Sequence, residues 1–125
     1  MLADRPAVAT VAVKDLAAAK RFYEGVLGLT QVASQGGEAV TYATGAGKLL
    51  VYRSQFAGTN KATAATWMVG NDIERIVKAL KVKGLVFEHY DMPQMKRQGD
   101  IHVAGDTRAA WFKDPDGNIH AIVSG

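Results

Sequence analysis

The side chains that could do acid–base or metal chemistry are concentrated in one stretch of the chain. Glu88, His89, Asp91 and His102 lie close together in sequence, and the third histidine, His120, stands apart near the C-terminus. Imidazoles and carboxylates can transfer protons or bind a divalent metal. Nothing in their spacing demands a metal site. We therefore expect solvated loop histidines here, with a metal site or an acid–base pair as the alternative.

Other catalytic arrangements are missing from the sequence. There is no cysteine, which excludes a thiolate nucleophile, a thiolate metal site and a disulfide framework. No Gly-x-Ser-x-Gly elbow is present. The Gly45–Lys48 segment departs from the phosphate-loop pattern because the first glycine is missing and no helix is expected to follow. The sequence therefore indicates no nucleophilic mechanism.

The composition is that of one globular domain. The chain has 125 residues, of which 48% are hydrophobic and 22% charged, and its net charge of +3 is scattered rather than clustered. Such a distribution argues against a nucleic-acid partner. No stretch approaches the roughly 20 apolar residues of a membrane span, and the N-terminus lacks a signal-peptide pattern. We expect a cytoplasmic protein with neither a nucleic-acid nor a membrane partner.

The elements that must position these side chains come as two copies of one unit. In each copy a short apolar strand leads to a helix-capping aspartate, Asp15 or Asp72, and a glycine ends the helix, Gly28 or Gly84. Three further strands follow each helix. The predicted strands are 7–13, 29–33, 38–44 and 48–53 in the first copy and 65–69, 85–90, 108–113 and 118–123 in the second.

The repeat defines a single domain, 1–125, made of two modules. Module one covers about 6–53, a linker 54–63 and module two about 64–125. The main asymmetry is an irregular insertion, 91–106, which contains Met92, Met95 and two glycines. Loops of this length often close over binding sites, so we expect a mobile lid here.

Two motifs support a family assignment. Asp15–Leu29 carries Phe22-Tyr23 and a Leu-Gly-Leu end, and Asp114–Asn118 reads Asp-Pro-Asp-Gly-Asn, a tight turn between strands. With the duplicated βαβββ unit, they resemble the vicinal oxygen chelate superfamily, which includes glyoxalases, bleomycin-resistance proteins and extradiol dioxygenases. The resemblance spans nearly the whole chain. It implies an α+β fold in which the two modules form an eight-stranded, incompletely closed barrel, with helices outside and a cleft inside.

The resemblance also implies where a metal would bind. Enzymes of the superfamily usually hold a divalent metal with His, Glu or Gln from the first and fourth strands of each module. The matching positions here are Val8, Val51, Ala65 and Ala121, and none carries a donor atom. A one-residue slip brings in Ala9, Leu50, Thr66 and His120, of which only His120 could ligate. We therefore expect no metal and no other cofactor.

Strand alternation assigns the remaining cleft residues. It predicts that Thr10, Arg53 and Trp67 face the cleft, with Trp111 from the strand before the tight turn, and that His120 points to the helix side. Thr10, Arg53, Trp67 and Trp111 are the predicted ligand-binding residues. The other positions predicted to face the cleft are aliphatic: Val8, Ala12, Leu49, Val51, Ala65, Val69, Ile119, Ala121 and Val123.

These features lead to two functional hypotheses. The first is a metal-free, bleomycin-resistance-like protein that binds a small organic molecule, anionic or aromatic in part, in the cleft. The alternative is a glyoxalase-like lyase or isomerase with a displaced metal, or a metal-independent enzyme that uses Glu88, His89 or His102 as acid and base. In either case we expect a homodimer, because strand edges and apolar cleft rims remain for a twofold partner to cover.

Overall fold

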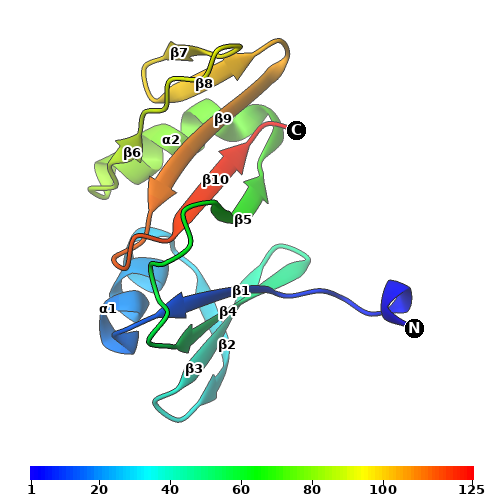
Figure 1. Ribbon diagram of the computed structural model, residues 1–125, viewed down its shortest axis with the longest axis vertical. Coiled ribbons are helices and arrows are strands. Elements are labelled where there is room, and N and C mark those ends of the chain that lie inside the picture. Colours follow the sequence, from blue (N-terminus) through cyan, green and yellow to red (C-terminus); the bar gives the residue numbers. More distant parts are fainter.

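The structure is a computed structural model that describes residues 1–125. It is α+β, with two helices and two mixed sheets that do not close on each other (Figure 1). This agrees with the two-module, incompletely closed barrel expected from the sequence. None of the helices is long and apolar enough to cross a membrane.

The first module forms a four-stranded sheet in the order β1-β4-β3-β2, in which β1 and β4 are parallel. A short helix, η1, precedes it, and α1 continues directly into a wider turn of helix, η2. The bounds are η1 Leu2–Asp4, β1 Ala9–Val13, α1 Leu16–Lys20, η2 Arg21–Val26, β2 Thr30–Gln35, β3 Ala39–Thr44 and β4 Gly47–Arg53.

The second module repeats this topology, with β5 parallel to β10 and antiparallel β9 on the other side of β10. Two separate strands, β6 and β8, pair with β9, and β7 pairs with β8. The bounds are β5 Thr63–Met68, η3 Gly70–Asp72, α2 Ile73–Val82, β6 Phe87–Glu88, β7 Lys96–Gln98, β8 Ile101–Ala104, β9 Thr107–Lys113 and β10 Ile119–Val123.

The stretch 91–106 is irregular only over 91–95, which corrects the sequence-based expectation. It contains the β7–β8 hairpin, and β8 extends the sheet along β9 (Figure 1). The strand expected over 85–90 is accordingly reduced to the two residues of β6. Short strands give too few alternating positions for a pattern to be visible, so only the pairing with β9 reveals them. His102 lies on β8 and is 1% exposed, so it is not a solvated loop histidine.

The capping residues behave differently in the two modules. Asp15 Oδ1 accepts hydrogen bonds from the amides of Ala17, at 2.9 Å, and Ala18, at 3.3 Å, as expected of an N-cap. Asp72 stands at the equivalent place before α2 but makes no capping hydrogen bond. It forms an exposed ion pair with Arg75 instead, at 3.2 Å.

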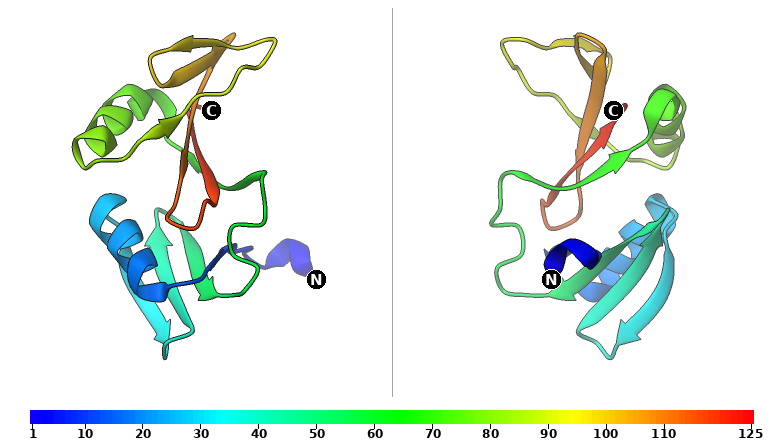
Figure 2. Two further views of the ribbon diagram at one scale, coloured as in Figure 1. Left: turned by 60° about the vertical axis from the view of Figure 1, so that its left-hand side comes forward. Right: turned by 90° about the vertical axis from the view of Figure 1, so that its right-hand side faces the viewer.

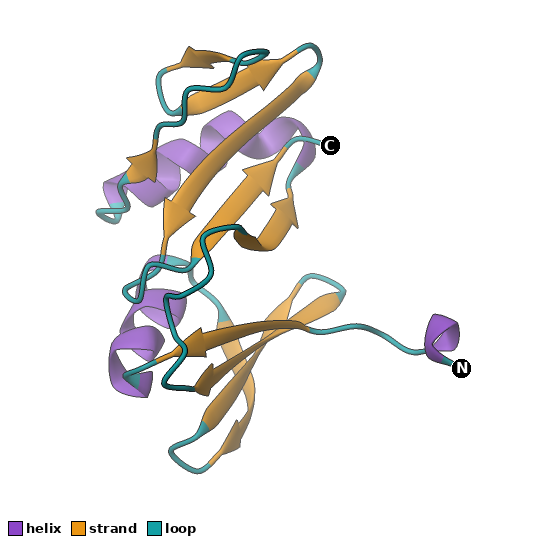
Figure 3. Cartoon of the chain, in the orientation of Figure 1, coloured by secondary structure: helices purple, strands orange, loops and turns teal.

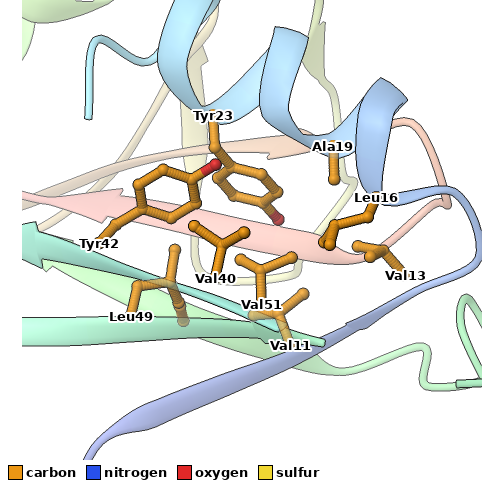
Figure 4. Close-up of a cluster of buried hydrophobic side chains, with 10 residues drawn as sticks. Val11, Val13, Leu16, Ala19, Tyr23, Val40, Tyr42, Leu49 and Val51 are labelled. Carbon is orange, nitrogen blue, oxygen red and sulfur yellow. The ribbon is translucent and has the colours of Figure 1, made fainter. Parts of the chain in front are cut away.

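Both helices lie on the same side of the molecule, as the two turned views show (Figure 2). The core lies between them and the sheets. In module one it consists mainly of valines and two tyrosines, Tyr23 from η2 and Tyr42 from β3 (Figure 4). Phe22, Leu27 and Trp67 pack against the cores of both modules and join them. We call the strand faces that the helices do not cover the open face (Figure 3).

Candidate ligand-binding site

The side chains of β4 point to the opposite faces from those predicted. Leu49 and Val51 are buried in the core beneath the helix, so they do not face a cleft, and Leu50 lies opposite Thr10 on the open face. The cause is turn length. Thr44 pairs directly with Gly47, whereas in module two the whole Asp114–Asn118 turn separates the paired residues Lys113 and Ile119. Aligning Gly47 with Gly117 therefore reverses the faces of the following strand.

The predicted faces of β1 and β10 are confirmed at several positions. Val11 and Val13 are buried in the core, which leaves Thr10 on the open face. His120 is fully buried on the helix side, as predicted. Ala121 lies on the opposite face, level with Trp111 on the neighbouring strand.

The open-face positions nearest to the family's metal ligands do not fit a metal. With the shift of β4 corrected, these positions hold Leu50 and Ala121 on the fourth strands and Thr10 and Thr66 on the first strands. Aliphatic groups and threonine hydroxyls are not a donor set for a transition metal. No group of three or more His, Cys, Asp or Glu side chains is placed to hold a metal ion.

Trp111 gives a physical reason for the alanine at position 121. Its indole Nε1–H donates to Thr63 Oγ1 on β5, at 3.3 Å. Since β10 lies between β9 and β5, the indole crosses the open face of β10 at the level of Ala121. Ala121 is 3% exposed as a result. A longer side chain there would compete with the indole for the same space.

Trp67 was predicted to face the cleft, but its position on β5 is on the helix side. It lies level with Ile122 on the helix side, where it packs against both module cores. It lines an apolar pocket of about 190 Å³ between α2 and the sheet, and it also lines a groove of about 310 Å³ along the seam between β1 and β5. Ala65, two residues earlier, is buried on the same side. The seven-residue count back from Asp72 therefore selects the wrong face of β5, because the alternation is offset by one.

Arg53 is also not with the other predicted site residues. It lies at the end of β4, on the same face as Val51, and its side chain is 52% exposed. Its guanidinium pairs with Glu38 Oε1 at 3.3 Å. Of the four predicted ligand-binding residues, only Thr10 and Trp111 share the open face. The hydroxyl of Thr10 donates to the carbonyl of Val8, at 3.0 Å.

Lys48 is a cation on the open face, and the sequence pattern did not indicate it as a site residue. It forms none of the ion pairs in the structure. It lines two adjoining grooves, one of about 580 Å³ over sheet one and one of about 310 Å³ along the seam between β1 and β5. The first groove also involves Val8, Val32, Ala33, Gln35, Thr41, Ala43 and Leu50.

A buried polar network joins the two modules on the helix side. The hydroxyl of Tyr23 donates to Asp114 Oδ2 at 2.7 Å, and His120 Nε2 lies 2.7 Å from the same hydroxyl. Asn118 donates from Nδ2 to Asp114 and to the carbonyl of Ala12. Because the one hydroxyl proton goes to Asp114, the imidazole donates from Nε2, and its Nδ1 has no partner.

Burial sets the protonation of this network. Desolvation and the nearby Asp114 carboxylate raise the pKa of Tyr23 far above its usual value. Desolvation lowers the pKa of His120 to about 4, although Asp114 acts in the opposite direction. Hydroxyl and imidazole are thus both neutral at pH 7, as a closed core requires. The sequence showed Asp114 and Asn118 only as turn residues, because their partners lie in module one.

Three aromatic rings meet on the open face beside β8 and β9. The ring of His102 lies 4.9 Å from that of Trp111, and the ring of Tyr90 lies 5.6 Å from Trp111. His102 Nε2 accepts a hydrogen bond from the backbone N–H of Tyr90, at 2.9 Å. Tyr90 Oη and His102 Nδ1 are both buried and have no partner.

The other groups considered for catalysis are engaged in ion pairs. Glu88 pairs with Lys113 at 3.4 Å. His89 Nε2 lies 2.7 Å from Asp100 Oδ1, and Lys81 from α2 holds the other oxygen of Asp100. The hydrogen bonds from Lys81 and His89 lower the pKa of Asp100. These contacts fasten the β7–β8 hairpin to the helix.

Solved structures share this fold at low sequence identity. An integron cassette protein from the mobile metagenome of a Halifax Harbour sewage outfall superimposes with a TM-score of 0.72, at 19% identity over 96% of this chain and 97% of that one. Lactoylglutathione lyase from Agrobacterium tumefaciens gives 0.70, at 18% identity over 93% and 90%.

A third structure contains ligands. It is a variant of the fosfomycin resistance protein FosX from Listeria monocytogenes, in complex with Mn(II) and 1S,2S-dihydroxypropylphosphonic acid. Its TM-score is 0.70, at 16% identity over 100% of this chain and 92% of that one. At these identities the likeness establishes the fold. No curated protein sequence matches the chain significantly.

The sequence itself matches a family model. Residues 5–122 match the model of the Glyoxalase/Bleomycin resistance protein/Dioxygenase superfamily, so the match spans both modules and the linker. The topology, the tight turn and the capped first helix all fall within that range. The chain therefore belongs to the glyoxalase/bleomycin resistance protein/dioxygenase superfamily.

Proposed function

We propose that this protein binds a small organic molecule with an anionic part on its open face. The ligand would be held by side chains of the protein and not by a bound metal ion. The observation that carries the proposal is the position of Lys48. It is an unpaired cation at the junction of two grooves whose other lining is largely apolar. An apolar groove with one free cation suits an organic anion, since the groove buries the carbon skeleton and the ammonium group pairs with the charge.

Binding is favoured over the metal-dependent chemistry of the family. Leu50 and Ala121 occupy the fourth-strand ligand positions, and Trp111 lies across the second of them. The carboxylate and imidazole groups of Glu88 and His89 are already paired. What the open face offers is a cation, aromatic surface, hydroxyl groups and the buried imidazole of His102, and these groups suit the recognition of a ligand.

A titration with small acids tests the proposal. We expect isothermal calorimetry to detect binding of one or more of benzoate, phenylphosphonate and glutarate. Lys48→Ala should weaken that binding by about tenfold or more, since a hydrogen bond to a charged group contributes roughly 1.5–3 kcal/mol. The matched control is Lys78→Ala on α2, which removes the same charge from an exposed lysine on the helix side and should leave affinity unchanged.

Two results would contradict the proposal. One is the absence of heat with every acid in the panel. The other is an equal loss of affinity in both lysine variants, because that would show a response to net charge alone.

A further inference from the structure

The aromatic cluster on the second module has the composition of a recognition site. Tyr90 lies between β6 and β7, His102 on β8 and Trp111 on β9, so three separate segments bring the rings together. Trp111 is level with Ala121, and Ala121 is level with Thr66, which lines the seam groove. The cluster therefore lies on the open face. It is two strands away from the seam groove, which Thr66 and Lys48 both line.

Two polar atoms in this cluster lack partners. The Tyr90 amide donates to His102 Nε2, so that nitrogen must be the unprotonated one. The ring proton is thus on Nδ1, which is a buried donor without an acceptor. Tyr90 Oη is buried and unpartnered as well. Buried polar groups are nearly always hydrogen-bonded in native proteins. Two buried polar atoms without a partner beside one indole therefore require an explanation.

The two unpartnered atoms determine which ligand group could form hydrogen bonds with them. His102 Nδ1–H can only donate a hydrogen bond. Burial and the nearby Glu88 raise the pKa of Tyr90, so its hydroxyl also keeps a proton to donate. Two donors next to aromatic edges match an oxygen acceptor carried on a flat ring, as in an aryl carboxylate.

One of these two atoms belongs to the segment that joins β6 to β7. Tyr90 belongs to this segment, and its backbone is held by the hydrogen bond to His102 itself. Further along, the turn from Met92 to Met95 has one internal hydrogen bond, from the Met95 amide to the Met92 carbonyl. The segment has no strand pairing of its own, so its movement would leave the pairing of β8 with β9 intact.

We propose that Tyr90 Oη and His102 Nδ1 are the polar anchors of an aryl carboxylate whose ring packs on Trp111, with the Tyr90–Met95 segment moving to admit it. This inference rests on the proposed function in one respect, that the open face binds an organic anion. It assigns a second subsite, separate from the grooves that Lys48 lines, with its own ligand class and two recognition residues. The carboxylate accepts from both donors, and the ring contacts the indole.

The test uses benzoate and its uncharged counterpart benzyl alcohol, measured by calorimetry on the full chain. Benzoate should bind the wild type more tightly than benzyl alcohol does. Tyr90→Phe should weaken benzoate binding by about tenfold. The same change should leave the melting temperature unchanged or raise it, because it removes a buried hydroxyl that has no partner. The control is Tyr52→Phe, a half-exposed tyrosine on the open face of module one, which should alter neither property.

A second readout follows His102 directly. In a ¹⁵N NMR spectrum of the side chains, benzoate should shift the Nδ1 resonance of His102 while the Nε2 resonance stays that of an unprotonated nitrogen. This separates a direct hydrogen bond from a general change of fold.

Several outcomes would overturn the inference. If benzoate affinity is unchanged in Tyr90→Phe but falls in Lys48→Ala, the proposed function stands and this site is wrong. The same holds if benzoate does not bind while another acid binds in a Lys48-dependent manner. A lower melting temperature for Tyr90→Phe with intact affinity shows that the hydroxyl is a structural group bonded to buried water. If no acid binds at all, this inference and the proposed function both fail.

Discussion

At the scale of single residues, the network of Tyr23, Asp114 and His120 predicts how stability depends on pH. The native pKa of His120 is lowered from 6.5 to about 4. Between these values the unfolded chain binds a proton that the native state does not bind. The free energy of unfolding should therefore fall as the pH is lowered from 6.5 to 4, with no further contribution below that range.

Urea unfolding at several pH values checks this prediction. His120→Gln should be less stable at pH 7 and should lose the slope between pH 6.5 and 4. His89→Gln should keep the slope, because His89 lies near the surface beside Asp100. Parallel stability curves for the wild type and His120→Gln would show that the buried imidazole titrates normally.

At the scale of elements, the two capping aspartates form a natural comparison. Asp15→Ala removes two capping hydrogen bonds from the start of α1 and should lower the free energy of unfolding by about 1 kcal/mol. Asp72→Ala removes an exposed ion pair and no capping bond, so its effect should stay within about 0.5 kcal/mol. Chemical denaturation measures the free energy of unfolding of both variants. Equal losses of stability would contradict the prediction, because they would show that the capping hydrogen bonds of Asp15 add nothing.

At the scale of the whole molecule, the open face leads us to predict a homodimer. Val32 is 53% exposed and Met68 67% exposed on this face, and every residue of the edge strand β2 is exposed. Residues 1–8 extend away from the body of the protein (Figure 1). A second copy would cover the unpaired strand edge of β2 and the rims of the two grooves that Val32 and Met68 line.

Light scattering at micromolar concentration tests the dimer. We expect twice the chain mass of 13.4 kDa for the wild type. Val32→Lys should shift the mass towards the monomer, whereas Val86→Lys, at a position 76% exposed next to β6, should not. A wild-type mass of 13.4 kDa alone would contradict the prediction.

The sequence by itself determined the duplicated unit, the helix bounded by Asp15 and Gly28, the tight turn at Asp114–Asn118 and the family. These features depend on residues close together in the chain: capping groups, positive-φ glycines and apolar periodicity. It also determined the absence of donor groups at the metal positions, since Val8, Val51, Ala65 and Ala121 are all aliphatic.

Only the tertiary structure decided which side chains meet. Leu49 and Val51 turned to the core because strand alternation is binary, so an odd difference in turn length reverses a whole strand. Trp67 turned to the core because the count back from Asp72 is offset by one residue. The orphaned atoms of Tyr90 and His102 became visible only when the β7–β8 hairpin paired with β9. Contacts between distant segments depend on register and pairing, and those are set by packing over the whole sheet rather than by local pattern.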